Sequence, residues 1–143
     1  MSADVKEAVA EWQGKSKFLG KNLKDGQVLM GGKEDAGRVS PMELLLMGLA
    51  GCTGIDVVDI LEKKRQPLEN FQVKVRGKRA EDYPMVYTEI EVEYLLWGIG
   101  INPKAVEQAI KLSEEKYCSA SIMLRKTAKI RSSYQILTPQ EES

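Results

Sequence analysis

The chain contains no histidine and only two cysteines among its 143 residues. The absence of histidine removes the commonest proton shuttle and the commonest metal ligand. Ser-His-Asp and Cys-His catalysis are therefore excluded. Zinc normally takes three or four nitrogen or sulfur ligands from a protein, so two thiols alone make a poor metal site, and no metal or other cofactor is expected. The two sulfurs are left with thiol redox chemistry or with simple packing.

An excess of charge and a long apolar run are also lacking. Lys plus Arg and Asp plus Glu each number 21, so no overall field favours nucleic acid or an anionic membrane. The strongly apolar run at 44–50 is far shorter than the ~20 residues of a membrane span. The N-terminus has no apolar signal core, which predicts a cytoplasmic protein. In that compartment the cysteines would normally be reduced, and a disulfide between them would be transient.

Glycines recur at every third residue around Cys52, at Gly48, Gly51 and Gly54, in a segment that otherwise has the pattern of a buried helix. Each glycine costs roughly 1 kcal/mol relative to alanine in a helix. A sequence tolerates that cost where another backbone or a ligand must come very close. The glycines therefore favour either chemistry at Cys52 or close packing of the helix in a dimer.

The start of this helix is clearly marked. Ser40 is a helix N-cap, Pro41 occupies the first helical position, and Glu43 stands three residues after the cap, which together predict a capping box. Basic residues at 63–65 suit the negative end of the helix dipole, and Pro67 ends the segment. Because 44–60 has almost no polar face, we expect a long central helix that is buried on most sides.

The remaining pattern predicts an α+β fold in a single domain, 1–143, with a disordered tail at about 138–143. Alternating apolar and polar residues at 71–76 and 89–96 favour antiparallel strands covered on one face. Asn102-Pro103 begins a second helix that runs to Tyr117, and Ser119 caps a short turn through Leu124. The other expected strands are 5–12, 17–19, 27–30 and 127–137.

Two motifs carry a resemblance to a known family: Ser40-Pro-Met-Glu-Leu44 leading into Gly51-Cys52, and Lys116-Tyr-Cys-Ser119 at the end of the second helix. With these motifs the chain resembles the OsmC/Ohr family of small thiol-dependent hydroperoxide reductases over nearly its whole length. The run Ile55-Asp-Val-Val58 and Glu115 before the second cysteine are similar to the OsmC-like, YhfA-type branch of that family.

The resemblance implies an intertwined homodimer in which antiparallel sheets surround the long helix and two active sites lie at the subunit interface. It implies that Cys52 is the peroxidatic cysteine, which attacks the peroxide, and that Cys118 is the resolving cysteine, which forms a disulfide with it. The substrate would be an organic hydroperoxide, the reductant an external dithiol, and the role oxidative-stress defence. Neither nucleic acid nor a membrane is expected as a partner.

The chain departs from the family at two positions. Better-characterised members have a glutamate ten residues before the peroxidatic cysteine, where this chain has Met42, and an arginine in the N-terminal strands, where residues 1–37 contain none. Glu43, one position later, and Arg38 are the candidates to complete a catalytic site with the two cysteines, and Arg125 is a second candidate cation. The capping box also explains Glu43 completely, and Arg38 also suits a solvated loop.

Other functions stay open at this point. Cys52 suits a small buried hydrophobic position and Cys118 suits packing at a helix end. The alternative to a peroxidase is a non-catalytic or weakly active OsmC-like protein that binds a small apolar ligand in the interface cleft. Nucleic-acid binding is disfavoured by the neutral charge and by the lack of a Gly-X-X-Gly loop between basic residues.

Overall fold

The computed structural model describes residues 4–141, and the chain divides into two compact units, Met1–Leu45 and Leu46–Ser143. Each unit contains its own three-stranded sheet. The expectation of one domain over 1–143 stays a prediction.

The first unit is built on an antiparallel sheet with the strand order β1 (Ala8–Trp12), β2 (Phe18–Asn22) and β3 (Gln27–Met30). The strands lie close to the expected segments 5–12, 17–19 and 27–30, with somewhat different ends. The β2–β3 turn places Asp25 at φ 64°, and the Asn22 side chain accepts hydrogen bonds from the amides of Lys24 and Gly26. Asparagine stabilises such turns through these local bonds.

Helix α1 (Pro41–Lys63) begins with the predicted capping box. The amide of Glu43 donates to Ser40 Oγ at 3.1 Å, and the amide of Ser40 donates to Glu43 Oε1 at 2.8 Å. Beyond the last helical turn, Arg65 takes a left-handed conformation with φ 57°, and the amide of Gln66 donates to the carbonyl of Leu61. This bond satisfies a carbonyl that the end of the helix leaves free.

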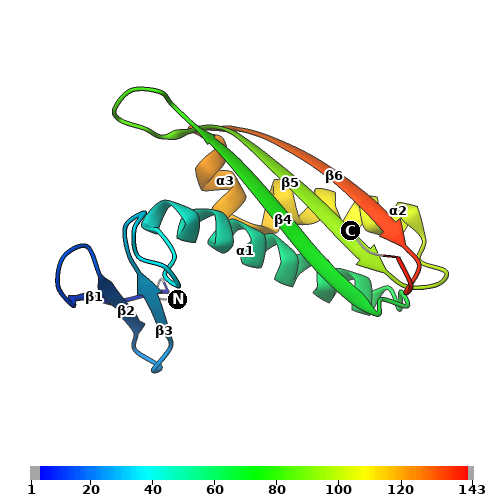
Figure 1. Cartoon of the computed structure of the whole chain (residues 1–143). Coiled ribbons are helices and arrows are strands. Elements are labelled where there is room, and N and C mark those ends of the chain that lie inside the picture. The colour runs from blue at the N-terminus through cyan, green and yellow to red at the C-terminus, as the bar shows by residue number, and fades with distance from the viewer. Residues whose placement is uncertain (1–3, 142–143) are drawn as a thin grey trace. The chain divides into compact units, whose positions relative to one another are not determined.

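The sheet of the second unit has the order β4 (Asn70–Arg79), β5 (Tyr87–Trp97) and β6 (Lys129–Leu137) (Figure 1). Strands β4 and β5 are antiparallel, as predicted, but β5 and β6 are parallel. The expectation of purely antiparallel sheets is therefore wrong for β6. The helical segment between β5 and β6 carries the chain back to the start of β5, and a parallel neighbour requires such a crossover.

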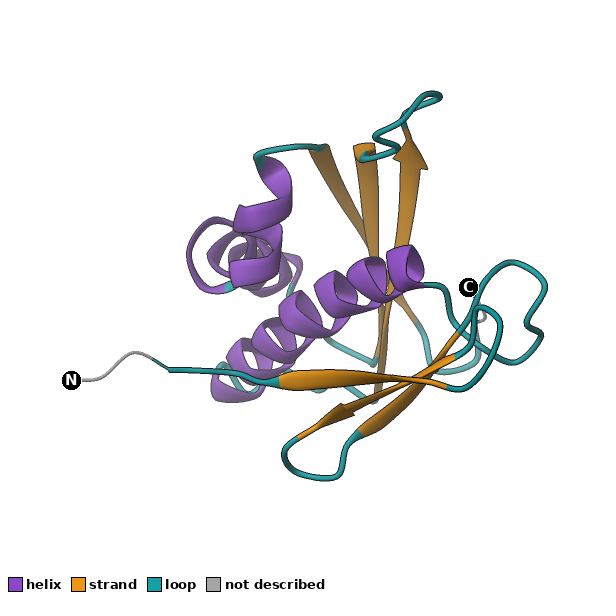
Figure 2. Cartoon of the chain, turned by 90° about the vertical axis from the view of Figure 1, so that its left-hand side faces the viewer, coloured by secondary structure: helices purple, strands orange, loops and turns teal. Residues whose placement is uncertain are grey.

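That crossover consists of α2 (Pro103–Leu112), one π-helical turn η1 (Ser113–Tyr117) and α3 (Ser119–Arg125). Asn102 caps α2, as predicted, by accepting the amide of Lys104 at 2.9 Å. These helices and α1 lie on one side of the sheet (Figure 2). The core between them contains fully buried side chains from α1, β5 and α2: Leu49, Val57, Leu61, Ile90, Leu96, Val106 and Ala109.

Helix α1 is less buried than the sequence predicted. Its buried residues follow one stripe, whereas Met47 and Ile55 are 51% and 73% exposed. Within residues 4–141, α1 is also the one helix whose length and hydropathy would suffice to cross a membrane, because small residues extend the apolar run beyond 44–50. The same composition suits a core helix, and the buried stripe of α1 packs against the sheet.

In the expected tail, Trp97 Nε1–H donates to the carbonyl of Glu141 at 2.5 Å, and the amide of Glu141 donates to the carbonyl of Thr138 at 2.9 Å. Residues 142–143 lie outside the described residues.

Candidate functional site

The second unit brings Cys52 and Cys118 together. Cys52 lies on the fourth turn of α1 and is half-buried, whereas Cys118 follows η1 and is fully buried. Cys52 is near enough to Cys118 to influence the pKa of that thiol, although no disulfide joins the two. The pair therefore combines a half-buried residue with one that solvent does not reach.

Burial raises the pKa of the Cys118 thiol, and the neighbouring Cys52 raises it further. The amide and the hydroxyl of Ser121 act in the opposite direction and lower the pKa of Cys118. Because the raising causes dominate, Cys118 is held as a neutral thiol beside Cys52.

The corner that carries Cys118 differs from the expected one. The N-cap of α3 is Cys118 itself, not Ser119, because Cys118 has extended backbone angles and its sulfur accepts the amide of Ser121 at 3.4 Å. The amide of Cys118 donates to the carbonyl of Ser113, five residues earlier, at 2.6 Å. Hydrogen bonds between residues five positions apart define a π-helix. Single π-helical turns are frequent at functional sites. Here the wider turn ends at the cysteine.

A chain of three hydroxyl groups connects α1, β5 and the turn that leads to Cys118. Thr53 Oγ1 lies 2.8 Å from both Tyr94 Oη and Ser113 Oγ. The Tyr94 hydroxyl donates to Glu114 Oε2 at 2.5 Å, and the Ser113 hydroxyl donates to Asp56 Oδ2 at 3.0 Å. Burial raises the pKa of Tyr94, and its bond to Glu114 raises it further, so Tyr94 is a neutral phenol.

Glu114 fixes η1 to three other elements. Its carboxylate accepts the hydroxyl of Ser132 on β6, with oxygen distances of 2.7 and 2.6 Å, in addition to the hydroxyl of Tyr94 on β5. Its backbone carbonyl accepts Ser121 Oγ at 3.1 Å and Arg125 Nη2 at 3.3 Å, both on α3. The position of the Cys118 turn therefore depends on side chains from both neighbouring strands.

Arg38 and Glu43 lie in the first unit. The guanidinium of Arg38 donates to the carbonyls of Phe18 and Met30 at 3.2 and 3.1 Å and to the side chain of Gln13 at 2.9 Å. Glu43 completes the capping box by accepting a hydrogen bond from the Ser40 amide. This hydrogen bond holds the pKa of the Glu43 carboxyl below its usual value. These contacts give both residues structural roles, and their roles at the cysteines stay predictions.

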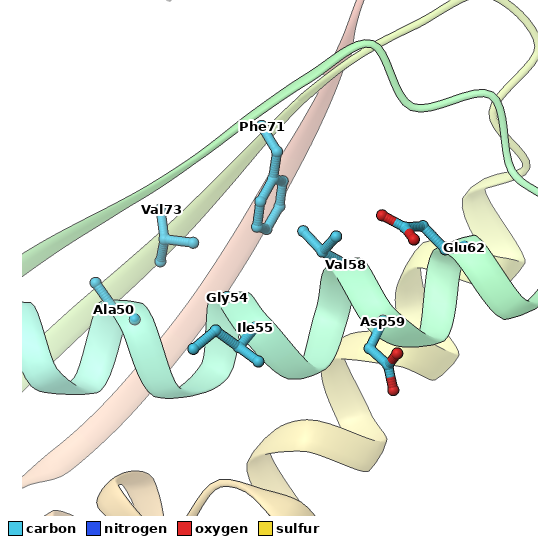
Figure 3. A pocket seen from close by; sticks show the side chains of 9 residues that line it. Ala50, Gly54, Ile55, Val58, Asp59, Glu62, Phe71 and Val73 are labelled. Atoms are coloured by element: carbon cyan, nitrogen blue, oxygen red, sulfur yellow. The ribbon is translucent and has the colours of Figure 1, made fainter. Parts of the chain in front are cut away.

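Gly51, which directly precedes Cys52, and Gly54 line a groove of about 550 Å³ between α1 and β4, and Figure 3 shows its side chains. A Cβ atom on Gly54 would lie 3.3 Å from Val73 of β4, so this glycine allows the strand to approach the helix. A Cβ atom on Gly51 would have no neighbour within 4 Å among the described residues. The groove is mainly apolar and is lined by Ala50, Gly51, Gly54, Ile55, Val58, Asp59, Glu62, Phe71 and Val73.

The sequence pattern did not identify the hydroxyl chain. One signal was present, because Ser113 interrupts the apolar stripe of the second helix and Thr53 stands in the most apolar helix. A buried hydroxyl needs a hydrogen-bond partner, so each of these residues implied another polar group nearby. Among residues 4–141 no group of three or more potential ligands could hold a metal ion.

Comparison with known proteins identifies the family. The family described as OsmC-like protein matches residues 32–133, which is more than half of the chain. The chain belongs to the OsmC-like family. Protein YhfA of Escherichia coli K12 is 38% identical over 131 residues, which are 92% of this chain and 98% of that protein. The resemblance to the YhfA-type branch is thus confirmed.

Solved structures agree with this OsmC-like fold. A hypothetical protein from Aquifex aeolicus VF5 has a TM-score of 0.87 and 38% identity, over 98% of this chain and 100% of that chain. An OsmC-like protein from Mycoplasma pneumoniae has a TM-score of 0.81 at 17% identity, over 95% and 99% of the two chains. An organic hydroperoxide resistance protein OsmC from Legionella pneumophila has a TM-score of 0.71 at 13% identity, over 94% and 99%. The last two likenesses show the fold alone.

Proposed function

We propose that this OsmC-like protein is a thiol-dependent peroxidase that reduces organic hydroperoxides in oxidative-stress defence. The observation that carries the proposal is the neighbouring pair of Cys52 and Cys118, with the first residue half-buried and the second fully buried. Family membership supports the proposal, as do the names of structural relatives such as the organic hydroperoxide resistance protein OhrB of Bacillus subtilis.

The reaction needs no histidine. The Cys52 thiolate attacks the terminal oxygen of the hydroperoxide, an S–O bond forms, and the O–O bond breaks. The peroxide is reduced to an alkoxide, which takes up a proton to become the alcohol, and Cys52 is oxidised to a sulfenic acid. The Cys118 sulfur then attacks the Cys52 sulfur. An S–S bond forms, the S–O bond breaks, and the hydroxyl group leaves with the thiol proton as water. An external dithiol reduces the disulfide and completes the cycle.

The burial of the two sulfurs supports this assignment of roles. A peroxide can reach the half-buried Cys52, whereas Cys118 is 0% exposed. Because burial raises its pKa, Cys118 stays protonated and poorly nucleophilic toward an outside oxidant. It reacts when the Cys52 sulfur in contact with it becomes electrophilic. Arg38 or Arg125 would supply the cation for the Cys52 thiolate, and Glu43 would orient that cation.

A second copy of the chain is proposed to complete the molecule as an intertwined homodimer in the cytoplasm. The exposed side of α1 includes Ile55 and Met47, and it borders the apolar groove beside Cys52. Exposed apolar surface of this kind marks an interface or a ligand site. The groove also favours a second candidate function, the binding of a small apolar ligand by a protein of low or no peroxidase activity.

The test is peroxide consumption with an organic hydroperoxide and a dithiol, in wild type and in two variants that serve as controls for each other. Wild type should consume peroxide and lose both titratable thiols per chain through one intramolecular disulfide. Cys52→Ser should consume none, and Cys118→Ser should stop at a sulfenic acid that over-oxidises. If peptide mapping after one equivalent of hydroperoxide finds Cys52 unoxidised, the peroxidase proposal fails and the ligand-binding candidate is favoured.

A further inference from the structure

The hydroxyl chain beside the cysteines contains fewer hydrogens than contacts. Its four contacts join Glu114, Tyr94, Thr53, Ser113 and Asp56 in that order. Each hydroxyl carries one hydrogen, and an ionised carboxylate carries none. With both carboxyl groups ionised, three hydrogens must serve four contacts.

The missing hydrogen can be located. Tyr94 donates to Glu114 and Ser113 donates to Asp56, so the hydrogens of both hydroxyls are used. Thr53 is then the only donor for two partners, although it lies 2.8 Å from each. One additional hydrogen, from either end of the chain, lets every hydroxyl donate to its neighbour in turn. Two oxygens in a buried contact with no hydrogen between them repel each other, because both carry partial negative charge and neither donates a hydrogen bond to the other.

We propose that Thr53, Tyr94 and Ser113 position Cys118 against Cys52, and that one hydrogen added at the position of Asp56 or Glu114 completes this arrangement. Thr53 directly follows Cys52, and Ser113 is the residue whose carbonyl accepts the amide of Cys118. The contact between Thr53 and Ser113 therefore joins the two cysteine-bearing segments. These residues act through the backbone and do not touch the peroxide.

The charged and titratable groups around the chain come from each element packed against it. They are Cys52 and Asp56 on α1, Tyr94 on β5, Glu114 on η1, Cys118 at the corner and Arg125 on α3. Strand β6 contributes the hydroxyl of Ser132. The two carboxyl groups that end the chain are Asp56 and Glu114, and a hydrogen added at either end fills the remaining contact.

Amide substitutions test the hydrogen count without a change of pH. In Asp56→Asn the side-chain N–H donates to Ser113. Ser113 then donates to Thr53, Thr53 to Tyr94 and Tyr94 to Glu114, so each of the four contacts holds one hydrogen. Glu114→Gln supplies the hydrogen from the other end with the same result. In Asp56→Asn combined with Glu114→Gln, one amide donates with its N–H and the other accepts with its oxygen, so the same four contacts are filled. The double variant should therefore gain no more than either single variant.

The first measurement is the midpoint of chemical denaturation at neutral pH. Asp56→Asn and Glu114→Gln should each raise the midpoint, and the double variant should gain no more than a single variant, a coupling that independent sites do not show. Asp59→Asn on α1 and Glu115→Gln on η1 are matched controls at exposed positions and should show neither effect.

The second measurement concerns position and rests on the proposed function. During turnover, a sulfenic acid at Cys52 either forms the disulfide with Cys118 or is over-oxidised by a second peroxide. Thr53→Val should raise the over-oxidised fraction roughly two- to tenfold, the equivalent of one hydrogen bond. The single amide variants should lower it by a similar factor. Thr88→Val, at an exposed threonine of β5, is the matched control and should behave as wild type.

The two proposals can fail separately. If wild type consumes no peroxide, the proposed function fails, but the denaturation midpoints still test the hydrogen count. Diamide, a diazene that takes up the two thiol hydrogens as it forms a disulfide, then reports how readily Cys52 and Cys118 join. Single amide variants that lower the midpoint, or a double variant whose gain is the sum of the single gains, overturn the hydrogen count. A Thr53→Val variant that forms the disulfide as readily as Thr88→Val overturns the positioning role.

Discussion

Gly51→Ala tests whether a second copy packs against α1. In the structure an added Cβ on Gly51 has no neighbour within 4 Å among the described residues. For an isolated chain, this substitution in mid-helix should therefore stabilise the folded state by roughly 0.5–1 kcal/mol. That gain would raise the melting temperature by about 2–4 °C for a chain of this size.

In the proposed homodimer the same methyl group has the opposite effect. Two-fold symmetry places an extra methyl on both copies, and overpacking of a filled contact costs typically ~1–3 kcal/mol for each. Even the lower end of this range, about 2 kcal/mol for the two methyl groups, weakens the dimer by more than tenfold, since a factor of ten corresponds to about 1.4 kcal/mol. We therefore expect Gly51→Ala to shift the protein toward monomer.

Sedimentation velocity over a range of protein concentrations, together with thermal melts, distinguishes the two outcomes. Gly54→Ala is the control, because its Cβ would meet Val73 of the same chain at 3.3 Å, a contact that exists with or without a partner. If Gly51→Ala melts 2–4 °C higher than wild type with unchanged sedimentation, no second copy packs at this position. The glycines of α1 would then need another explanation, such as a ligand.

Three further predictions follow from local contacts. Ser40→Ala should lower the free energy of unfolding by about 1 kcal/mol in urea titrations, through loss of the helix cap. Glu43→Gln should leave the free energy of unfolding nearly unchanged at neutral pH, because glutamine also completes the capping box. The folded protein lowers the pKa of Glu43, so wild type should lose the stability that this carboxylate contributes only as the pH falls below 4.5. The glutamine variant should not show that loss. Gly77→Ala should destabilise the protein by ~1–3 kcal/mol, since its Cβ would lie 2.6 Å from the Tyr87 ring, and an unchanged urea midpoint would contradict this.

The reactivity of the two thiols gives a last prediction. Like the proposed function, it depends on the burial of Cys118. Burial raises the pKa of Cys118, and the thiolate is the form that reacts with iodoacetamide. Native protein should therefore be alkylated at Cys52 well before Cys118, and both should react at similar rates after unfolding in urea. Faster alkylation of Cys118 in the native protein would show that its burial does not protect it.

The sequence by itself determined the features whose causes are local. The capping box of α1 needs only Ser40 and Glu43 in the right spacing, and Asn102 caps α2 in the same way. The alternation of β4 and β5 depends on side chains that point to opposite faces at successive residues. The family resemblance rested on motifs of this short range, at 40–44, 51–52 and 116–119.

Only the tertiary structure decided which distant groups meet. The parallel pairing of β6 depends on the path of the whole crossover, and local alternation is the same for parallel and antiparallel neighbours of a half-buried strand. The contact between Cys52 and Cys118, and the bonds of Thr53 to Tyr94 and Ser113, join residues 41 to 66 positions apart. Their energies depend on burial and on counts of donors and acceptors, which exist only after the elements have packed together.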